Sequence, residues 1–76
     1  MFVSIYMVKE TLANGDEGGY SEDSVIVDTL EEVDKVIGEI QLSLDEEGKE
    51  SNSELKIVKV ETYNLAKLKP SAIKEF

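Results

Sequence analysis

A run of turn-forming residues at positions 13–19, Ala-Asn-Gly-Asp-Glu-Gly-Gly, most constrains how this chain can fold. Asn14-Gly15 and Gly18-Gly19 supply the positive φ angles that a chain reversal requires. The run follows residues 2–11, which are β-branched and aromatic and are typical of a strand, and it precedes a second strand predicted over residues 20–27. We therefore expect the two strands to pair as an antiparallel hairpin.

Residues 29–44 are predicted to form an amphipathic helix. Thr29 and Glu32 have the spacing of a capping box, in which the threonine hydroxyl would accept a hydrogen bond from the Glu32 amide. Apolar residues then recur at three- and four-residue spacing and make a stripe wide enough to bury: Val33, Val36, Ile37, Ile40 and Leu44. Gly38 inside this helix costs about 1 kcal/mol relative to alanine, and nothing in the sequence accounts for it.

The remaining segments are a loop, a third strand and a tail. Residues 45–54 are polar and acidic and contain turn formers, so we expect a solvated acidic loop there. Residues 55–66 predict a strand whose apolar alternation changes phase at Val58, and either a β-bulge or burial on both faces would explain the change. Pro70 should stop regular structure, which leaves residues 67–76 as a tail with at most a short turn of helix.

These elements predict one small α+β domain over residues 1–76: a three-stranded, mainly antiparallel sheet with one amphipathic helix packed on one face. The third strand should lie beside the first, which gives the spatial order 2-1-3 and a right-handed crossover through the helix. The other sheet face would then be uncovered, and we expect a self-association surface there: Phe2, Tyr6, Val8 and Tyr63. The folded-back tail or a different protein are the other candidates for covering it.

The residue types that are missing narrow the chemistry. The 76 residues include no histidine, cysteine, tryptophan or arginine. Without histidine and cysteine, Ser-His and Cys-His pairs cannot be built, and the usual zinc ligands are absent. We therefore expect a non-enzymatic protein with no catalytic residues, no metal site and no cofactor. No signal peptide or membrane-spanning run is recognisable, which predicts a cytoplasmic location.

The formal net charge of −9 is unevenly spread. Residues 1–54 contain 15 acidic residues and three lysines, whereas residues 55–76 contain two acidic residues and five lysines. Direct binding to nucleic acid or to an anionic membrane is disfavoured, because both depend on clustered basic residues. A charged partner should therefore be basic.

The densest acidic feature is the predicted helix with its following loop: Glu31, Asp34, Glu39, Asp45, Glu46, Glu47 and Glu50. The simplest interpretation is a solubilising surface. A sharper one is a surface that resembles the phosphates of nucleic acid and occupies the basic groove of a nucleic-acid-binding protein. A hard-cation site is a third alternative, although residues 14–18 and 45–48 both lack the spacing of a calcium loop.

One family resemblance points in the same direction. The leading strand, then Gly18-Gly19-Tyr20 and Asp28-Thr29-Leu30-Glu31-Glu32, is similar to the start of HicB-type antitoxins. In that family an inhibitory domain binds a small basic ribonuclease toxin, so the resemblance implies an acidic protein that masks a basic one. This sequence lacks the Pro-Gly-containing segment expected between the family's second and third strands and has no DNA-binding portion, and we transfer no residue roles from the family.

The sequence thus favours a small acidic protein-binding module. The use of lysine without arginine is typical of accessory proteins of AT-rich bacteria or their phages. Two alternatives remain. The first is a structural homo-oligomer, such as a homodimer, whose acidity serves only solubility. The second is a small-ligand binder or enzyme with tyrosine and carboxylate groups at a subunit interface.

Overall fold

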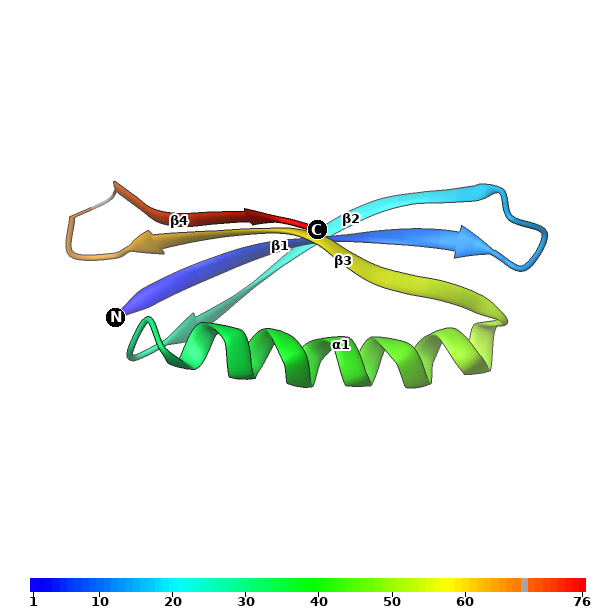
Figure 1. Cartoon of the computed structure of the whole chain (residues 1–76), viewed down its shortest axis with the longest axis horizontal. Coiled ribbons are helices and arrows are strands. Elements are labelled where there is room, and N and C mark those ends of the chain that lie inside the picture. The colour runs from blue at the N-terminus through cyan, green and yellow to red at the C-terminus, as the bar shows by residue number, and fades with distance from the viewer. Residues whose placement is uncertain (68) are drawn as a thin grey trace.

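The structure of this protein is a computed structural model that describes residues 1–67 and 69–76. Its elements follow one another in the chain as β1 (Phe2–Leu12), β2 (Glu17–Val27), α1 (Glu32–Ser51), β3 (Ser53–Asn64) and β4 (Lys69–Glu75). The strands form a four-stranded sheet in the order β2-β1-β3-β4, and all neighbouring strands are antiparallel. The single helix α1 lies along one face of this sheet (Figure 1). The α+β class is therefore confirmed, but the prediction of three strands is wrong.

The fourth strand forms in the segment that we expected to be an irregular tail. β4 pairs with the second half of β3, from Lys59 opposite Glu75 to Asn64 opposite Lys69. Pro70 does not prevent this pairing, because β4 is the outermost strand and the register shifts beside Tyr63, the residue opposite the proline. The expected final turn of helix is not formed.

The hairpin between β1 and β2 turns where the sequence predicts it. The Leu12 amide donates to the Asp16 carbonyl at 2.8 Å, and Gly15 has a φ of 89°. The second strand begins earlier than expected, because Gly18 is an extra residue in a bulge between the Glu10 and Thr11 pairings rather than part of the turn. A Cβ atom at Gly18 would lie 2.4 Å from the Glu10 carboxylate, so a larger residue here would require the Glu10 side chain to move.

The helix begins one turn later than predicted. Its N-cap residue, Glu31, makes no side-chain capping hydrogen bond. The Thr29 hydroxyl donates to the Glu32 carboxylate at 3.2 Å, and the Glu32 amide donates to the Thr29 carbonyl at 3.3 Å. The predicted capping box is therefore replaced by a turn that precedes the helix.

The helix also extends through most of the predicted 45–54 loop, which corrects that prediction. Gly48 is buried and continues the inward stripe after Leu44, so it does not end the helix. The end comes at Asn52, whose backbone is left-handed (φ 54°, ψ 47°) and whose amide donates to the Gly48 carbonyl. A Cβ atom at Gly48 would lie 2.6 Å from the Ser53 carbonyl, because β3 turns back closely against the helix.

A β-bulge explains the change of phase in β3. Met7 pairs with Lys59 and Val8 pairs with Ile57, so Val58 is the extra residue. The bulge brings Ile57 and Val60 to the same face as Val8, where they form the buried core. Partly buried side chains pack against that core: Tyr6, Val33, Ile37, Ile40, Leu44 and Leu55.

This arrangement corrects the expected face of β1. Tyr6 and Val8 lie under the helix, although we expected them on the uncovered face. Ser4 and Thr62 are on the same helix-covered face, where their hydroxyls share a hydrogen bond of 2.8 Å at 0% and 2% exposure.

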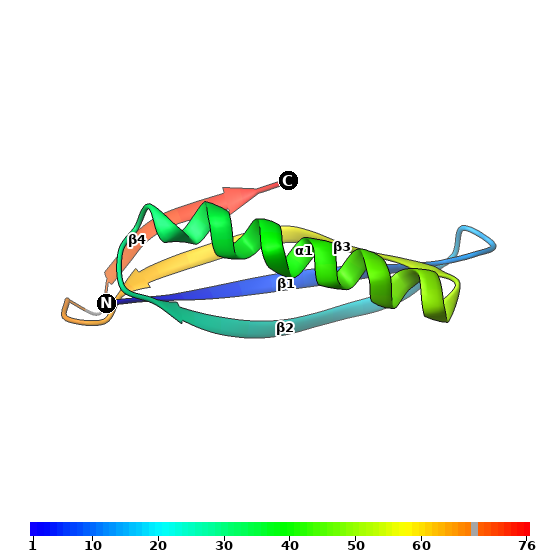
Figure 2. The same ribbon diagram turned by 90° about the horizontal axis from the view of Figure 1, so that it is seen from below.

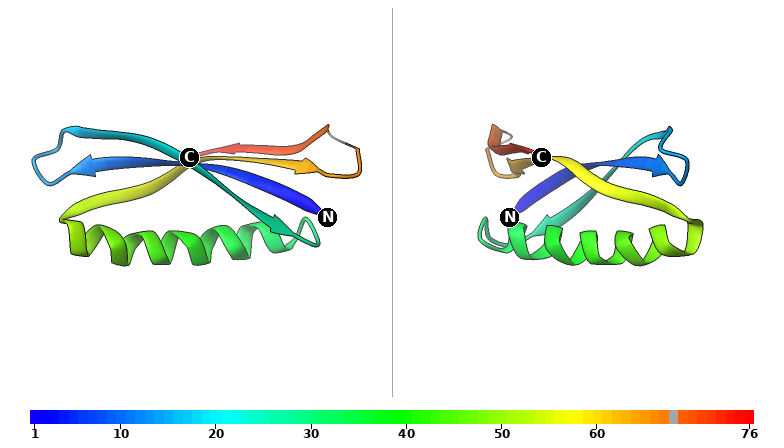
Figure 3. Two further views of the ribbon diagram at one scale, coloured as in Figure 1. Left: turned by 180° about the vertical axis from the view of Figure 1, so that it is seen from behind. Right: turned by 45° about the vertical axis from the view of Figure 1, so that its right-hand side comes forward.

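The uncovered face carries the other side chains of each strand, and Figures 2 and 3 show that the helix covers only one side of the twisted sheet. Ile26 of β2 pairs with Val3 of β1. Ile73 of β4 pairs with Glu61 of β3, which in turn pairs with Ile5 of β1. Ile26 and Ile73 are 60% and 58% exposed. Within the described residues, no helix is long and apolar enough to cross a membrane.

Candidate functional site

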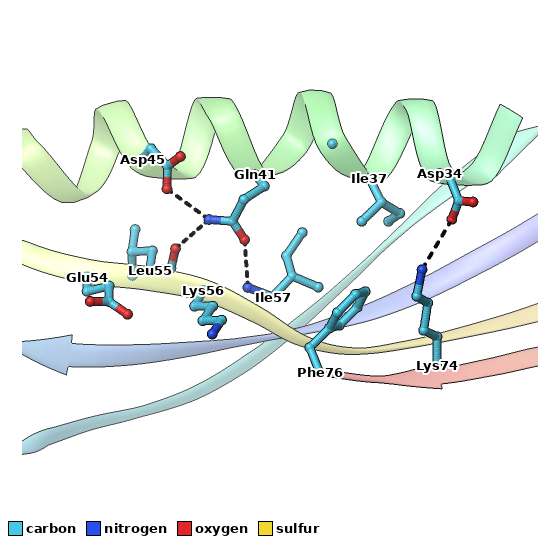
Figure 4. Close-up of a pocket in the computed structure, with 11 residues that line it drawn as sticks. Asp34, Ile37, Gln41, Asp45, Glu54, Leu55, Lys56, Ile57, Lys74 and Phe76 are labelled. Atoms are coloured by element: carbon cyan, nitrogen blue, oxygen red, sulfur yellow. Dashed lines mark hydrogen bonds and ion pairs between the residues drawn. The ribbon is translucent and has the colours of Figure 1, made fainter.

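A groove of about 720 Å³ lies between α1 and the first half of β3, and we call it the edge groove (Figure 4). It is lined by residues of the helix, of β3 and of the end of the chain: Asp34, Ile37, Gly38, Gln41, Asp45, Glu54, Leu55, Lys56, Ile57, Lys74 and Phe76. Apolar side chains form its floor, and charged side chains stand at its rim.

The groove lies beside the half of β3 that does not pair with β4. β4 pairs with residues 59–64, and the last contact along this edge is the Phe76 amide, which donates to the Val58 carbonyl at 2.8 Å. In the part of the chain that the structure describes, no strand pairs with residues 53–57 on the edge that faces away from β1. Unpaired backbone groups at a strand edge are a template for pairing with another chain.

The side chain of Gln41 occupies part of this open edge. Its amide oxygen accepts from the Ile57 amide at 2.9 Å, and its amide nitrogen donates to the Leu55 carbonyl at 2.8 Å and to Asp45 at 2.9 Å. The oxygen and both donor hydrogens of the glutamine are therefore used. Gln41 gives β3 the hydrogen bonds that a neighbouring strand would otherwise provide (Figure 4).

Gly38 leaves space on the helical wall of the groove. A Cβ atom built at Gly38 would have no heavy atom within 4 Å, so packing inside the protein does not require glycine here. Gly38 lies four residues after Asp34, and Asp45 lies four residues after Gln41, which places all four side-chain positions along one side of the helix. The backbone of α1 is thus approachable at the middle of the groove.

The charged residues at the rim include both signs. Asp34 and Lys74 form an exposed ion pair at 3.8 Å, and the Lys74 ammonium lies 5.2 Å from the centre of the Phe76 ring. Asp45 and Glu54 add negative charge at the other end of the groove. The groove adjoins a helix whose residues 32–51 contain seven acidic side chains and two lysines, so its electrostatic surroundings are negative.

The seven predicted partner-binding acids lie on or directly before α1, but they do not form one surface. Asp34 and Asp45 line the edge groove. Glu39, Glu46 and Glu50 are exposed on the outer side of the helix, because their seven- and four-residue spacings match its turns. Glu31 is the N-cap residue, and the helical spacing places Glu47 on the side away from the groove.

Comparison of the chain with protein-family models, curated proteins and solved structures finds no match.

The uncovered sheet face contains a polar cluster beside its isoleucines. The hydrogen bond from Tyr63 lowers the pKa of the Glu61 carboxyl, and the Lys59 ammonium, 3.0 Å away, lowers it further. The same contacts with Glu61 raise the pKa of Tyr63 and of Lys59. On the helix-covered face, burial raises the pKa of Tyr6, with a smaller contribution from Asp23. Among the described residues, no group of three or more acidic side chains is arranged to hold a metal ion.

The four predicted self-association residues are divided between the two faces. Tyr63 lies opposite Val3 on the uncovered face, whereas Tyr6 and Val8 are under α1. Phe2 is half-buried at the start of β1 and alternates with Val3 onto the helix-covered face.

Sequence reasoning missed the residues that make the edge groove. Gln41 falls within the predicted helix of residues 29–44 and Phe76 within the predicted tail, and neither was assigned a role. The usable signal was the position of Gln41, one residue after Ile40 in the apolar stripe, where a polar side chain borders the sheet.

Proposed function

We propose that this protein is a non-enzymatic binding module that engages a basic protein through the acidic outer side of α1 and the adjoining edge groove. The observation that carries the proposal is that seven acidic residues are concentrated on one 20-residue helix, which lies along one face of the sheet. This charge favours a nucleic-acid-binding protein as the partner, because the surface with which such a protein binds phosphates contains clustered basic residues. The composition is in keeping with an accessory or inhibitor protein of bacteria or phages.

The acidic side chains are available for such a contact. Glu39, Glu46 and Glu50 are exposed, and the pair between Glu46 and Lys49 at 3.6 Å is itself fully at the surface. An exposed pair of this kind contributes little to stability and exchanges readily for a better partner. The helical rise places Glu39 and Glu46 about 10 Å apart along the axis, so several charges can face one basic surface at once.

The test is affinity capture from a bacterial lysate on the immobilised protein, eluted in steps of increasing salt. The proposal predicts recovery of a basic nucleic-acid-binding protein that elutes as salt rises and is displaced by added DNA or RNA, because phosphates compete for the same basic groups. A captured protein that is insensitive to both salt and nucleic acid would contradict the proposal. So would retention of the same proteins on a column carrying the variant with Glu39, Glu46 and Glu50 changed to lysine.

Self-association is a second candidate function, and the exposed isoleucines of the uncovered face favour it. Ile5, Ile26 and Ile73 lie on that face, which contains lysines as well as acids and is less negative than the helical side. Two copies of this acidic chain would repel each other least through this face. Light scattering across a range of concentrations should show a dimer that the Ile26→Lys variant abolishes, and a concentration-independent monomer would exclude this function.

A further inference from the structure

The first half of β3 combines an open strand edge with an apolar groove beside it. Residues 53–57 have β1 on one side, and the hydrogen bonds of Gln41 to Leu55 and Ile57 on the other. Both of these backbone groups face Gln41 and α1 (Figure 4), and they belong to the edge of β3 that faces away from β1.

The other two open edges of the sheet are less suited to accept a strand. The groove beside β2 that is lined by Gly18, Gly19 and Tyr20 is about 220 Å³ in volume, and the course of β2 is interrupted by the bulge at Gly18. β4 contains Pro70, which has no amide hydrogen to donate. The edge groove brings an open edge together with apolar side chains and an approachable helix backbone at Gly38.

The lining of the groove specifies the chemistry of its occupant. Alternate side chains of an added strand would point to opposite faces. Those that point toward the helix would meet Ile37, Ile57 and Phe76, which favours apolar residues. Those that point to the other face would lie beside Glu54 and Lys56 of β3. The helical rim of the groove carries Asp34 and Asp45, so basic residues are favoured in the segment except beside Lys56.

We propose that the edge groove binds an extended segment of the basic partner, with alternating apolar and basic residues, which adds to the free half of β3 as a strand and replaces the side chain of Gln41. This inference rests on the proposed function and specifies how part of the partner is recognised. Main-chain hydrogen bonds would supply affinity, and the groove and its acidic rim would supply selectivity. Gln41 holds the edge in the free protein and turns toward solvent when the segment binds.

The experiment is a titration of the ¹⁵N-labelled full chain with an alternating Lys-Val peptide of about seven residues, long enough to cover the free edge. The side-chain amide signals of Gln41 and the backbone signals of Gly38, Leu55 and Ile57 should shift most. Two peptides serve as controls: a Glu-Val peptide with reversed charge, and the Lys-Val peptide with proline as its central residue. The proline peptide keeps most of the positive charge but cannot form a complete strand.

Two variants should change the affinity in opposite directions. Gly38→Leu fills the groove from the helical wall without meeting another atom at its Cβ, and we expect binding to weaken by about tenfold. Gln41→Ala removes the side chain that competes for the edge, and we expect binding to strengthen by about threefold. The matched control is Leu42→Ala, on an exposed helix position outside the groove, which should leave the affinity unchanged.

The outcomes separate this inference from the function on which it rests. Shifts confined to the outer acids of α1, equal for the Lys-Val and proline peptides, would overturn strand addition but leave binding of a basic partner intact. Shifts along β2 instead of β3 would overturn the assignment of the edge. No shift with the Lys-Val peptide at millimolar concentration, or an equal response to the Glu-Val peptide, would contradict both proposals.

Discussion

The Gln41 side chain and the Ile57 backbone are joined by a hydrogen bond of 2.9 Å, so a helix residue satisfies an amide at the open edge of a strand. The same glutamine side chain donates to the Leu55 carbonyl two residues earlier. An edge strand with free amides and carbonyls is prone to pair with other molecules. Gln41 therefore both stabilises the free protein and limits unspecific pairing at this edge.

Replacing Gln41 by alanine should destabilise the protein. The variant leaves the Ile57 amide and the Leu55 carbonyl without their partner in a partly buried position, and we expect the free energy of unfolding to fall by about 1–3 kcal/mol. Urea denaturation followed by circular dichroism measures this change. Leu42→Ala, on the exposed side of the same helix, is the control and should change it by less than about 0.5 kcal/mol. Equal losses of unfolding free energy for the two variants would show that the hydrogen bonds of Gln41 do not stabilise the β3 edge.

The two glycines of α1 should respond in opposite ways to the same substitution. Gly38→Ala places its methyl group in open space and should stabilise the helix by about 0.5–1 kcal/mol. Gly48→Ala places a methyl group 2.6 Å from the Ser53 carbonyl, and should destabilise the protein by more than about 1 kcal/mol despite the same gain in helix propensity. Thermal unfolding of both variants tests this, and a stabilising Gly48→Ala would contradict the close return of β3.

The buried hydroxyl pair should show strong coupling. Ser4→Ala leaves the Thr62 hydroxyl unpaired at 2% exposure, and Thr62→Val does the same to Ser4, so each single change should cost about 1–3 kcal/mol. The double variant removes both polar groups and should cost clearly less than the sum of the single changes. A double-mutant cycle from urea denaturation measures the coupling. Simple additivity would mean that the two hydroxyls do not depend on each other.

Glu61 should make stability depend on pH at both ends of the scale. Its pKa is lowered in the folded protein, so its contribution is present above the unfolded value of about 4.3 and is lost as pH falls through the folded pKa. The pKa values of Tyr63 and Lys59 are raised by the same contacts, so their contributions are present below about pH 10 and are lost at higher pH.

The measurement is the difference in urea midpoint between the natural protein and Glu61→Gln across the pH range. The difference should be largest between about pH 5 and 9 and should shrink toward both extremes. Glu22→Gln, an exposed substitution on β2, controls for the loss of one negative charge. A difference that stays constant with pH would show that the Lys59, Glu61 and Tyr63 contacts do not persist in solution.

Local signals predicted those parts of the fold that depend on neighbouring residues. The hairpin at Asn14-Gly15 and the apolar stripe of α1 could both be predicted, because each depends on residues within one short segment of the sequence. The end of α1 was mispredicted because glycine usually breaks helices. Here Gly48 lies inside the helix, where the close approach of Ser53 requires a glycine. β4 was missed because its strand character comes from pairing with residues 59–64 and not from its own composition.

The same distinction explains the candidate site. The acidic residues of α1 were evident in the sequence, but their division between the groove rim and the outer side depends on helical phase beyond residue 44. β1 is apolar on both faces, so its sequence could not decide which face the helix covers. The groove lies beside the half of β3 that does not pair with β4, and this depends on a long-range pairing that no short segment contains.

The central claim is that the acidic side of α1 binds a basic partner and does not serve solubility alone. Its most direct test compares two charge-reversed variants of equal net charge, each changed from −9 to −3. One carries lysine at Glu39, Glu46 and Glu50, and the other carries lysine at Glu17, Glu22 and Asp28. The affinity of each for the basic protein recovered by lysate capture, labelled with a fluorophore, is measured by anisotropy at physiological salt, where charges more than about 8 Å apart are largely screened. We predict that the helix variant binds at least about tenfold more weakly than the natural protein, while the second variant changes by less than about threefold. Equal affinities of the two variants would contradict the account, because they would show that only the total charge matters.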